Sequence, residues 1–308
     1  MITKEAKDKK KCVFQEFFFD SARMGFEYIL KNLLSSDDII LMPAYIGQSE
    51  KEGSGVFDPI RHTHANVLFY ELDEHLQVRE TKLIEQLALP NIKALLLIHY
   101  FGFPQKSIFT LKAICEQRNI VLIEDCAHSL QSSIDGIKLG TIGDVALFSL
   151  HKLIATQNGG VVKINNERYA SLLEQEAENI SYEDLLQYSK TDISATSVLR
   201  IKNYHLYLDG LSNNSPFFDA MFPNLENGVV PLNFPILIKN YDRFTMYNEL
   251  IDKGFITVSL YYRLIDELER DLYPTSFALS DTILNLPVHQ DTSEEDIKRL
   301  VDCLNNWL

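Results

Sequence analysis

Residues 123 to 160 have the sequence IEDCAHSLQSSIDGIKLGTIGDVALFSLHKLIATQNGG, and this stretch decides the fold. Two short apolar runs, Ile120 to Glu124 and Val145 to Leu150, are typical of strands that are buried on both faces of a parallel sheet. Asp125 follows the first run and Lys152 follows the second. Because ligands of such sheets bind beyond the carboxyl ends of the strands, we expect Asp125 and Lys152 to lie in one crevice.

A carboxylate and an amine in one crevice are the groups that pyridoxal 5′-phosphate (PLP) requires. Lys152 would form an imine with the cofactor's aldehyde, and Asp125 would keep the pyridine nitrogen protonated so that the ring takes up negative charge. Each residue alone has a simpler explanation, because Asp125 can cap a helix and Lys152 can be a surface lysine. The two together favour the cofactor site.

Strands and helices alternate through the first two thirds of the chain. The expected strands are Ile39 to Met42, Val67 to Leu72, Ala94 to His99, Val121 to Glu124, Val145 to Leu150 and Gly160 to Ile164. The expected helices are one that opens at Ser21 or Ala22, Glu80 to Leu89, and Ile108 to Arg118. This alternation predicts an α/β fold with a mostly parallel sheet flanked by helices.

The remaining third of the chain predicts a smaller α+β unit, so we divide the chain into a large domain of residues 1–195 and a small C-terminal domain of residues 196–308. Its expected elements are a helix at Ser197 to Leu211, strands at Leu232 to Lys239 and Ile283 to Val288, and a helix at Arg243 to Asp252. Thr292 and Glu295 form the pattern of a capping box before a final helix. In the large domain, Gln48 to His64 has no periodicity, and we expect a loop there that shapes the pocket.

The composition excludes several classes of protein. The chain has 308 residues and a net charge of −14, so we expect no nucleic-acid partner. Its four cysteines (Cys12, Cys115, Cys126 and Cys303) are scattered without metal-ligand spacing, so we predict reduced thiols and no metal site. No apolar segment approaches membrane-spanning length and no signal-peptide core is present, so we expect a cytoplasmic protein without a membrane partner.

Several segments in a fixed order resemble the DegT/DnrJ family of PLP-dependent sugar aminotransferases, which have the fold-type-I architecture. They are FFFDSARMGF, DDIILMPAYIGQS, ALLLIHYFGFP, NIVLIEDCAHSLQSS, IGDVALFSLHK followed by NGG, and ILNLPVHQDTSEEDI. These matches span most of the chain. The combination of EDCAH with GD and FSLHK is specific to the family, whereas each string alone is a weak signal.

The resemblance implies roles for seven residues. Lys152 corresponds to the lysine that carries the cofactor, Asp125 to the partner of the pyridine nitrogen, and His128 to a residue near the phenolic oxygen. Ser149 corresponds to a serine that contacts the phosphate. The turn that binds the phosphate through backbone amides and side chains corresponds to Ser21, Ala22 and Arg23, although Ala22 stands where the family has glycine. For His128, a satisfied buried histidine is the alternative, and for Ser149 a small residue at a strand end.

Two further departures from the family pattern bear on the site. The interval between Phe148 and Lys152 is shorter than the family's, which makes His151 a rival for the lysine position; in one branch of the family a histidine replaces the lysine and the proteins dehydrate their substrates. Gly47 stands where the family often has an aromatic residue on the cofactor ring, so Tyr45 or another residue must cover that face.

The resemblance implies an aminotransferase that moves an amino group from an amino acid, glutamate by resemblance, to a keto-sugar linked to a nucleotide, for amino-sugar and polysaccharide biosynthesis. It also implies a homodimer, which is a common form of oligomer. Two alternatives stay open: a PLP-dependent sugar dehydratase, and a non-catalytic PLP-binding regulatory protein.

Overall fold

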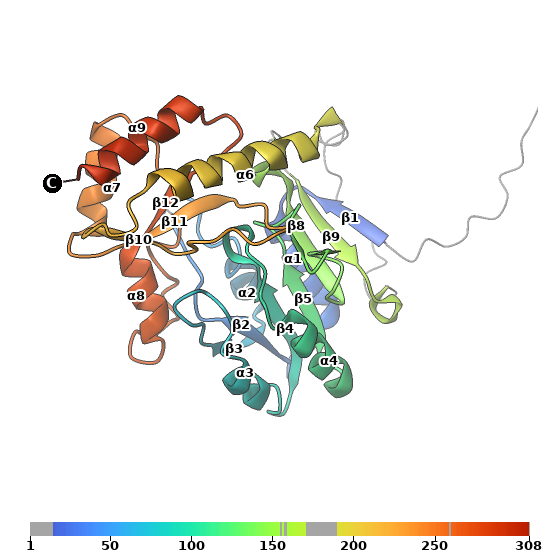
Figure 1. The fold of residues 1–308 in the computed structure, drawn as a ribbon. Helices are drawn as coiled ribbons and strands as arrows, with labels where there is room; N and C mark the ends of the chain where they lie inside the picture. Colours follow the sequence, from blue (N-terminus) through green and yellow to red (C-terminus); the bar gives the residue numbers. More distant parts are fainter. Residues whose placement is uncertain (1–14, 155, 157–158, 171–189, 259, 308) are drawn as a thin grey trace, which may run out of the picture.

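A computed structural model describes residues 15–154, 156, 159–170, 190–258 and 260–307. Its main feature is a seven-stranded sheet with the order β1-β9-β8-β5-β4-β2-β3 (Figure 1). In chain order the strands are β1 (Gln15–Phe19), β2 (Ile39–Pro43), β3 (Asn66–Tyr70), β4 (Ile92–Ile98), β5 (Val121–Asp125), β8 (Val145–Ser149) and β9 (Gly160–Ile164). The five neighbouring strands from β8 to β3 are parallel, whereas β9 runs antiparallel to β8 and β1 antiparallel to β9. The predicted mostly parallel sheet is confirmed.

The middle strand of the sheet is β5, and β8 is one of its two neighbours. Every residue of both strands is buried, as expected for strands that are covered on both faces. They pair in parallel with Asp125 opposite Leu147, so the last residue of β5 lies two residues before the end of β8. This register brings the chain that follows Ser149 past the end of β5.

The segments that connect the strands contain helices, and these helices cover the sheet. They are α1 (Ala22–Leu33), α2 (Asp58–Thr63), α3 (Glu80–Gln86) and α4 (Ile108–Arg118). Three 3₁₀ turns (Tyr100–Gly102, Leu150–Lys152 and Glu167–Tyr169) and a small hairpin of β6 (Ser133–Ile134) and β7 (Ile137–Lys138) complete this part. Helix α1 packs on β8, β9 and β1, which places its N-terminus at the ligand-binding edge of the sheet.

The C-terminal part is built on a separate antiparallel sheet, β10 (Phe218–Ala220), β11 (Asn233–Ile238) and β12 (Ile283–Pro287). Its helices are α6 (Ile193–Gly210), α7 (Arg243–Asp252), α8 (Pro274–Thr282) and α9 (Glu294–Asn305) (Figure 1). The domain boundary at residues 195/196 stays a prediction, and it falls in the first turn of α6. Among the described residues, no helix combines the length and the apolar character that a membrane crossing needs.

Several local predictions were wrong in ways that have physical reasons. The segment from Gln48 to His64 contains α2, a helix too short to show a period, which begins at Asp58 with a proline in its first turn. The final helix is capped by Ser293 and not by Thr292, because the Ser293 hydroxyl accepts a hydrogen bond from the Asp296 amide. The predictions also missed β1, β10 and α8. The sequence from Glu167 to Asp192 is polar and acidic, which predicts a variable excursion, and this segment lies mostly outside the described residues.

Candidate active site

A cavity of about 550 Å³ lies at the carboxyl ends of β5 and β8. The N-terminus of α1 and the segment between Gly47 and Val56 form its walls, so the expected loop does shape a pocket. All seven predicted site residues border it: Ser21, Ala22, Arg23, Asp125, His128, Ser149 and Lys152. The structure therefore brings together residues that are far apart in the sequence, and their individual roles stay predictions.

Asp125 provides a buried carboxylate at this cavity because it is the last residue of β5. Its Oδ1 accepts a hydrogen bond of 2.9 Å from the Ala127 amide, which fixes the side chain at the start of the following turn. Burial raises the pKa of Asp125, while the Ala127 amide and the charge of Lys152 act in the opposite direction. The carboxylate is thus held in place with one oxygen committed to the backbone.

Lys152 provides the amine from the 3₁₀ turn that follows β8. Two contacts hold this turn: the Leu150 amide donates to the Gly159 carbonyl at 2.8 Å, and Arg200 Nη2 donates to the Lys152 carbonyl at 3.1 Å. Burial lowers the pKa of the Lys152 amine, and the charge of Asp125 raises it in part. Because neutral amine is the nucleophilic form, burial makes Lys152 more reactive than a surface lysine.

His128 stands beside this pair as a buried imidazole. Its Nδ1 accepts a hydrogen bond of 3.2 Å from the Phe101 amide, which places the ring proton of the neutral form on Nε2. Burial lowers the pKa of His128 well below its ordinary value, and the charge of Lys152 lowers it further. The ring is therefore a neutral hydrogen-bond donor, and not a cation.

The N-terminus of α1 reaches the cavity because a glycine lies against it. A Cβ on Gly160 would collide with the backbone of Ser21 and Ala22, so only glycine permits this approach. The Gly159 amide also donates to the Asp20 carbonyl at 2.8 Å, and Ser21 caps the helix by accepting from the Met24 amide at 3.2 Å. The first amides of a helix have no partner within the helix, so this end can bind an anion such as phosphate.

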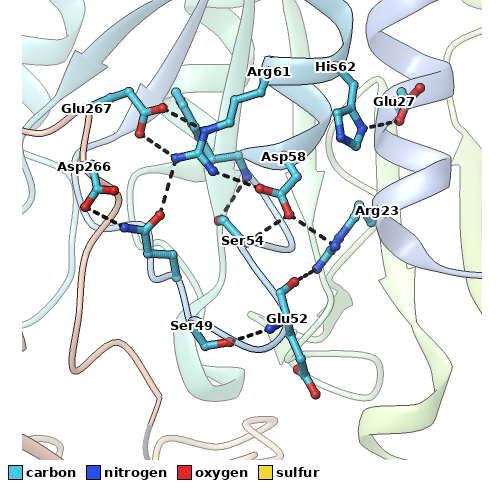
Figure 2. A network of polar contacts seen from close by, with 12 residues as sticks. Arg23, Glu27, Ser49, Glu52, Ser54, Asp58, Arg61, His62, Asp266 and Glu267 are labelled. Atoms are coloured by element: carbon cyan, nitrogen blue, oxygen red, sulfur yellow. Dashed lines mark hydrogen bonds and ion pairs between the residues drawn. The ribbon is translucent and has the colours of Figure 1, made fainter.

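Arg23 has other partners in the structure. Its Nη2 donates to the Glu52 carbonyl at 2.7 Å, and its Nη1 pairs with Asp58 at 3.2 Å (Figure 2). Asp58 in turn pairs with Arg61, which forms two hydrogen bonds with Glu267. Figure 2 shows that this network ties the wall of the cavity to a segment that follows α7. Its bonds hold the loop, and the role of Arg23 in phosphate binding stays a prediction.

Ser149 and His151 flank Lys152 at the same cavity. Ser149 Oγ lies 3.3 Å from His151 Nδ1, and partial loss of water around the His151 ring lowers its pKa, as does the charge of Lys152. His151 is exposed, whereas the Lys152 side chain is partly buried.

Tyr261 and Tyr262 also border the cavity, and the sequence did not identify them. Tyr45, which the sequence offered as a cover for the cofactor ring, is fully buried and packs behind Tyr261 instead. The only signal in the sequence was Gly47, whose lack of a side chain indicated that another residue supplies the aromatic surface.

A second cavity of about 630 Å³ lies between α6 and the C-terminal sheet. It shares Lys152 and Leu260 with the first cavity, and its lining is mostly apolar. Arg200 also borders it but is buried, with hydrogen bonds to Gln290, to the Leu232 carbonyl and to the Lys152 carbonyl. The Lys152 side chain therefore has space on two sides.

A buried cluster of His99, Glu124 and Cys126 lies below the cavity, with ligand atoms within 4.8 Å of one another. The Glu124 carboxylate already accepts hydrogen bonds from the amides of Gly140, Ile142 and Gly143, and it contacts His99 Nε2 at 3.2 Å. Because His99 Nδ1 accepts from the Gln105 amide, the proton lies on Nε2 and points at Glu124. These bonds position the turn that leads into β8.

The cavity fits PLP on these observations. Its volume lies in the range of small-molecule sites. It joins a buried carboxylate, a partly buried amine and a helix N-terminus, which correspond to the ring nitrogen, the aldehyde and the phosphate of the cofactor.

Comparisons with known proteins find similarity to aminotransferases. A model of the DegT/DnrJ/EryC1/StrS aminotransferase family matches residues 54–180. A protein of Acidithiobacillus ferrooxidans, named UDP-N-acetyl-3-dehydro-alpha-D-glucosamine 3-aminotransferase, is 23% identical over 82% of this chain and 74% of its own length.

Solved structures share the fold across almost the whole chain. Helicobacter pylori PseC, described as an aminotransferase involved in the biosynthesis of pseudoaminic acid, is 18% identical with a TM-score of 0.76, over 94% of this chain and 85% of its own. Escherichia coli GDP-4-keto-6-deoxy-D-mannose-3-dehydratase with bound hydrated PLP is 18% identical with a TM-score of 0.72, over 94% and 87%. At this identity the likeness shows the fold alone, and the expected fold-type-I architecture is confirmed.

Proposed function

Because a model of the DegT/DnrJ/EryC1/StrS aminotransferase family matches residues 54–180, we propose that the chain is a PLP-dependent aminotransferase of this family that transfers an amino group from an amino acid to a nucleotide-linked keto-sugar. The observation that carries the proposal is the meeting of Asp125 and Lys152 at one cavity. The relative from A. ferrooxidans supports the acceptor class, since its name specifies a UDP-linked 3-dehydro sugar.

The cofactor, when bound, supplies an aldehyde that links to an amine and a ring that takes up negative charge from the substrate carbon. In our proposal the Lys152 amine would hold the cofactor at its aldehyde and, when free, would move the proton at the donor's α-carbon. Burial, which lowers the pKa of this amine, suits it to that work as a base. Asp125 keeps the proton on the ring nitrogen, which makes the ring an electron acceptor.

The other residues position the cofactor. His128 Nε2 would donate to the phenolic oxygen, which a neutral imidazole can do without adding positive charge. The amides at the start of α1 and the Ser149 hydroxyl, which border the cavity, would hold the phosphate. The second cavity, which Lys152 also borders, gives the sugar space beside the reacting amine.

We further propose that glutamate is the donor, that the enzyme serves amino-sugar and polysaccharide biosynthesis, and that it acts as a homodimer in the cytoplasm. Twofold pairs are the commonest oligomers, and a subunit interface near the cavity would add residues to the substrate site. Sedimentation of the holoenzyme tests the dimer.

A sugar dehydratase is the second candidate. His151 borders the same cavity next to Lys152, and a dehydratase is among the proteins that share the fold. A dehydratase would release water and give a product without a new amine, so mass spectrometry of the product separates the two activities.

The test is a pair of half-reactions. Glutamate added to the yellow holoenzyme should bleach its absorbance, and a nucleotide keto-sugar added afterwards should restore the colour and yield an amino sugar. Lys152→Ala should do neither. A holoenzyme that no amino acid bleaches would contradict the transaminase and favour a non-catalytic PLP-binding protein.

A further inference from the structure

Five aromatic rings pack together beside the cavity: Tyr45, Tyr100, Phe101, His128 and Tyr261. The Tyr261 ring stacks on Tyr45, with 5.0 Å between centroids and an interplanar angle of 17°. The rings of Tyr100, Phe101 and His128 stand at 70°, 86° and 79° to it, with centroids 5.6, 5.7 and 6.1 Å away. Tyr261 is therefore the centre of the cluster.

Only two members of this cluster, Tyr261 and His128, border the cavity. Tyr45, Tyr100 and Phe101 are buried behind them, with exposed fractions of 1% or less. Tyr45 covers one face of the Tyr261 ring, so the part of the ring that borders the cavity is not that face. Tyr261 also lies near Asp125, whose charge adds to the effect of burial in raising the pKa of the Tyr261 phenol.

The backbone of the chain is strained at Tyr261. Its φ is +60°, a left-handed conformation that is strained for a bulky side chain. Hydrogen bonds on both sides maintain it: the Gln48 amide donates to the Arg263 carbonyl at 3.0 Å, and the Ser280 hydroxyl donates to the Tyr261 carbonyl at 2.8 Å. Such strain is found where a side chain must be presented in one direction.

Gly47 lies directly against Tyr261. A Cβ built on Gly47 would come 3.1 Å from Tyr261 Cδ1 and 3.3 Å from its Cα, closer than most side-chain contacts allow. Gly47 is also bridged to Leu264 in an antiparallel contact, which brings the two segments side by side. The missing side chain at residue 47 thus makes room for the tyrosine that arrives from the C-terminal part of the chain.

We propose that Tyr261 supplies the aromatic surface against which the pyridine ring of the cofactor packs. The absence of a side chain at Gly47 leaves the space that Tyr261 occupies. The proposal rests on the proposed function, because it assumes that PLP occupies the cavity. It assigns a positioning role to a residue outside the predicted large domain, so that the C-terminal part of the chain completes the cofactor site.

Pyridoxamine 5′-phosphate is the probe for the test, because it lacks the aldehyde and its binding reports ring contacts without the link to Lys152. Stacked aromatic pairs are worth about 0.5–1.5 kcal/mol beyond the area they bury, which is about 2- to 12-fold in Kd at 1.36 kcal/mol per tenfold. Tyr261→Ala and Tyr261→Leu should weaken binding by at least this factor, and Tyr261→Phe should bind like the wild type. The matched control is Tyr273→Ala, which removes a partly buried tyrosine that contacts Phe69 away from the cavity.

A swap of the aromatic side chain separates stacking from a general loss of stability. Gly47→Phe alone should weaken binding because it collides with Tyr261. Gly47→Phe combined with Tyr261→Ala should recover part of the lost affinity, since the new ring then occupies the vacated space. Thermal unfolding of each apo variant shows whether it is folded, and Tyr261→Phe keeps the test open if the smaller variants unfold.

Unchanged affinity in folded Tyr261→Ala and Tyr261→Leu would overturn the proposal, and so would a loss in Tyr261→Phe as large as that in Tyr261→Ala. These results leave the proposed function intact, provided that the wild type binds the probe. A wild type that binds neither PLP nor pyridoxamine 5′-phosphate would instead contradict the proposed function itself.

Discussion

Asp125 ends one of two neighbouring parallel strands and Lys152 follows the other; both border one cavity, and each shifts the pKa of the other toward the charged form. Burial acts against both charges, raising the pKa of the acid and lowering that of the amine. Burial therefore favours the neutral forms of both groups, while their mutual attraction favours the charged forms. A ligand that replaces the charge of one group changes the state of the other.

The first prediction concerns the amine. Asp125→Asn keeps the acceptor for the Ala127 amide but removes the negative charge that raises the pKa of Lys152. The pKa of Lys152 should then fall further, so its neutral form appears at lower pH. Peptide-resolved labelling with acetic anhydride measures the midpoint, which should move to lower pH in the variant. Labelling of the exposed Lys239 should not change, and a Lys152 midpoint that stays in place would refute the coupling.

The second prediction concerns the contact between Gly160 and the start of α1. Gly160→Ala places a methyl group in the backbone of Ser21 and Ala22, and overpacking of this kind costs about 1–3 kcal/mol. Urea denaturation should show this loss, and PLP should bind more weakly because the helix N-terminus moves away from the phosphate. Gly55→Ala is the stability control, since nothing lies within 4 Å of its added Cβ. Equal stability of the two variants would contradict the close approach.

The third prediction concerns the network that holds the cavity wall. Asp58→Asn can still accept from the Ser54 amide but loses its ion pairs with Arg23 and Arg61 (Figure 2). Partly exposed pairs are worth about 0.2–1 kcal/mol each. Amide hydrogen exchange in residues 47–57 should become faster, without a change in the central strands. Asp219→Asn breaks an exposed pair with Lys239 and serves as the control; protection in residues 47–57 that matches the wild type would be the contrary outcome.

The fourth prediction concerns Glu124. Burial alone would raise its pKa, but hydrogen bonds from His99 and from the amides of Gly143 and Gly140 outweigh burial and lower it. A lowered pKa in the folded state contributes stability that is present above the unfolded value of about 4.3 and is lost as the pH falls through the folded value. Glu124→Gln should cost about 3 kcal/mol near pH 7, because it leaves buried amides without a partner.

The pH dependence provides the check on Glu124. Denaturation of the wild type and Glu124→Gln between pH 3 and pH 7 should show a difference in unfolding free energy that shrinks toward acid, as the wild-type carboxylate takes up its proton. A difference that is constant over this range would show that the charge of Glu124 does not hold the turn before β8.

The sequence predicted the parts of the site that depend on strand order. Asp125 and Lys152 follow buried runs, and the rules of parallel sheets bring the ends of such runs together. Tyr261 escaped prediction because its place depends on the pairing of its segment with residues 46–48, far away in the sequence, and on a left-handed backbone that no pattern announces. The ion-pair partner of Arg23 could not be predicted either, because the chain has many acidic residues and only the fold brings Asp58 to Arg23.

The most direct measurement of the central claim is reduction of the PLP-loaded protein with borohydride, followed by digestion and mass spectrometry. We expect the pyridoxyl mass on the peptide that contains Lys152, and a loss of that label in Lys152→Ala, while Lys163→Ala keeps it. A label on another lysine, or a wild type that retains no pyridoxyl group after reduction, would contradict the assignment of this cavity as a PLP site.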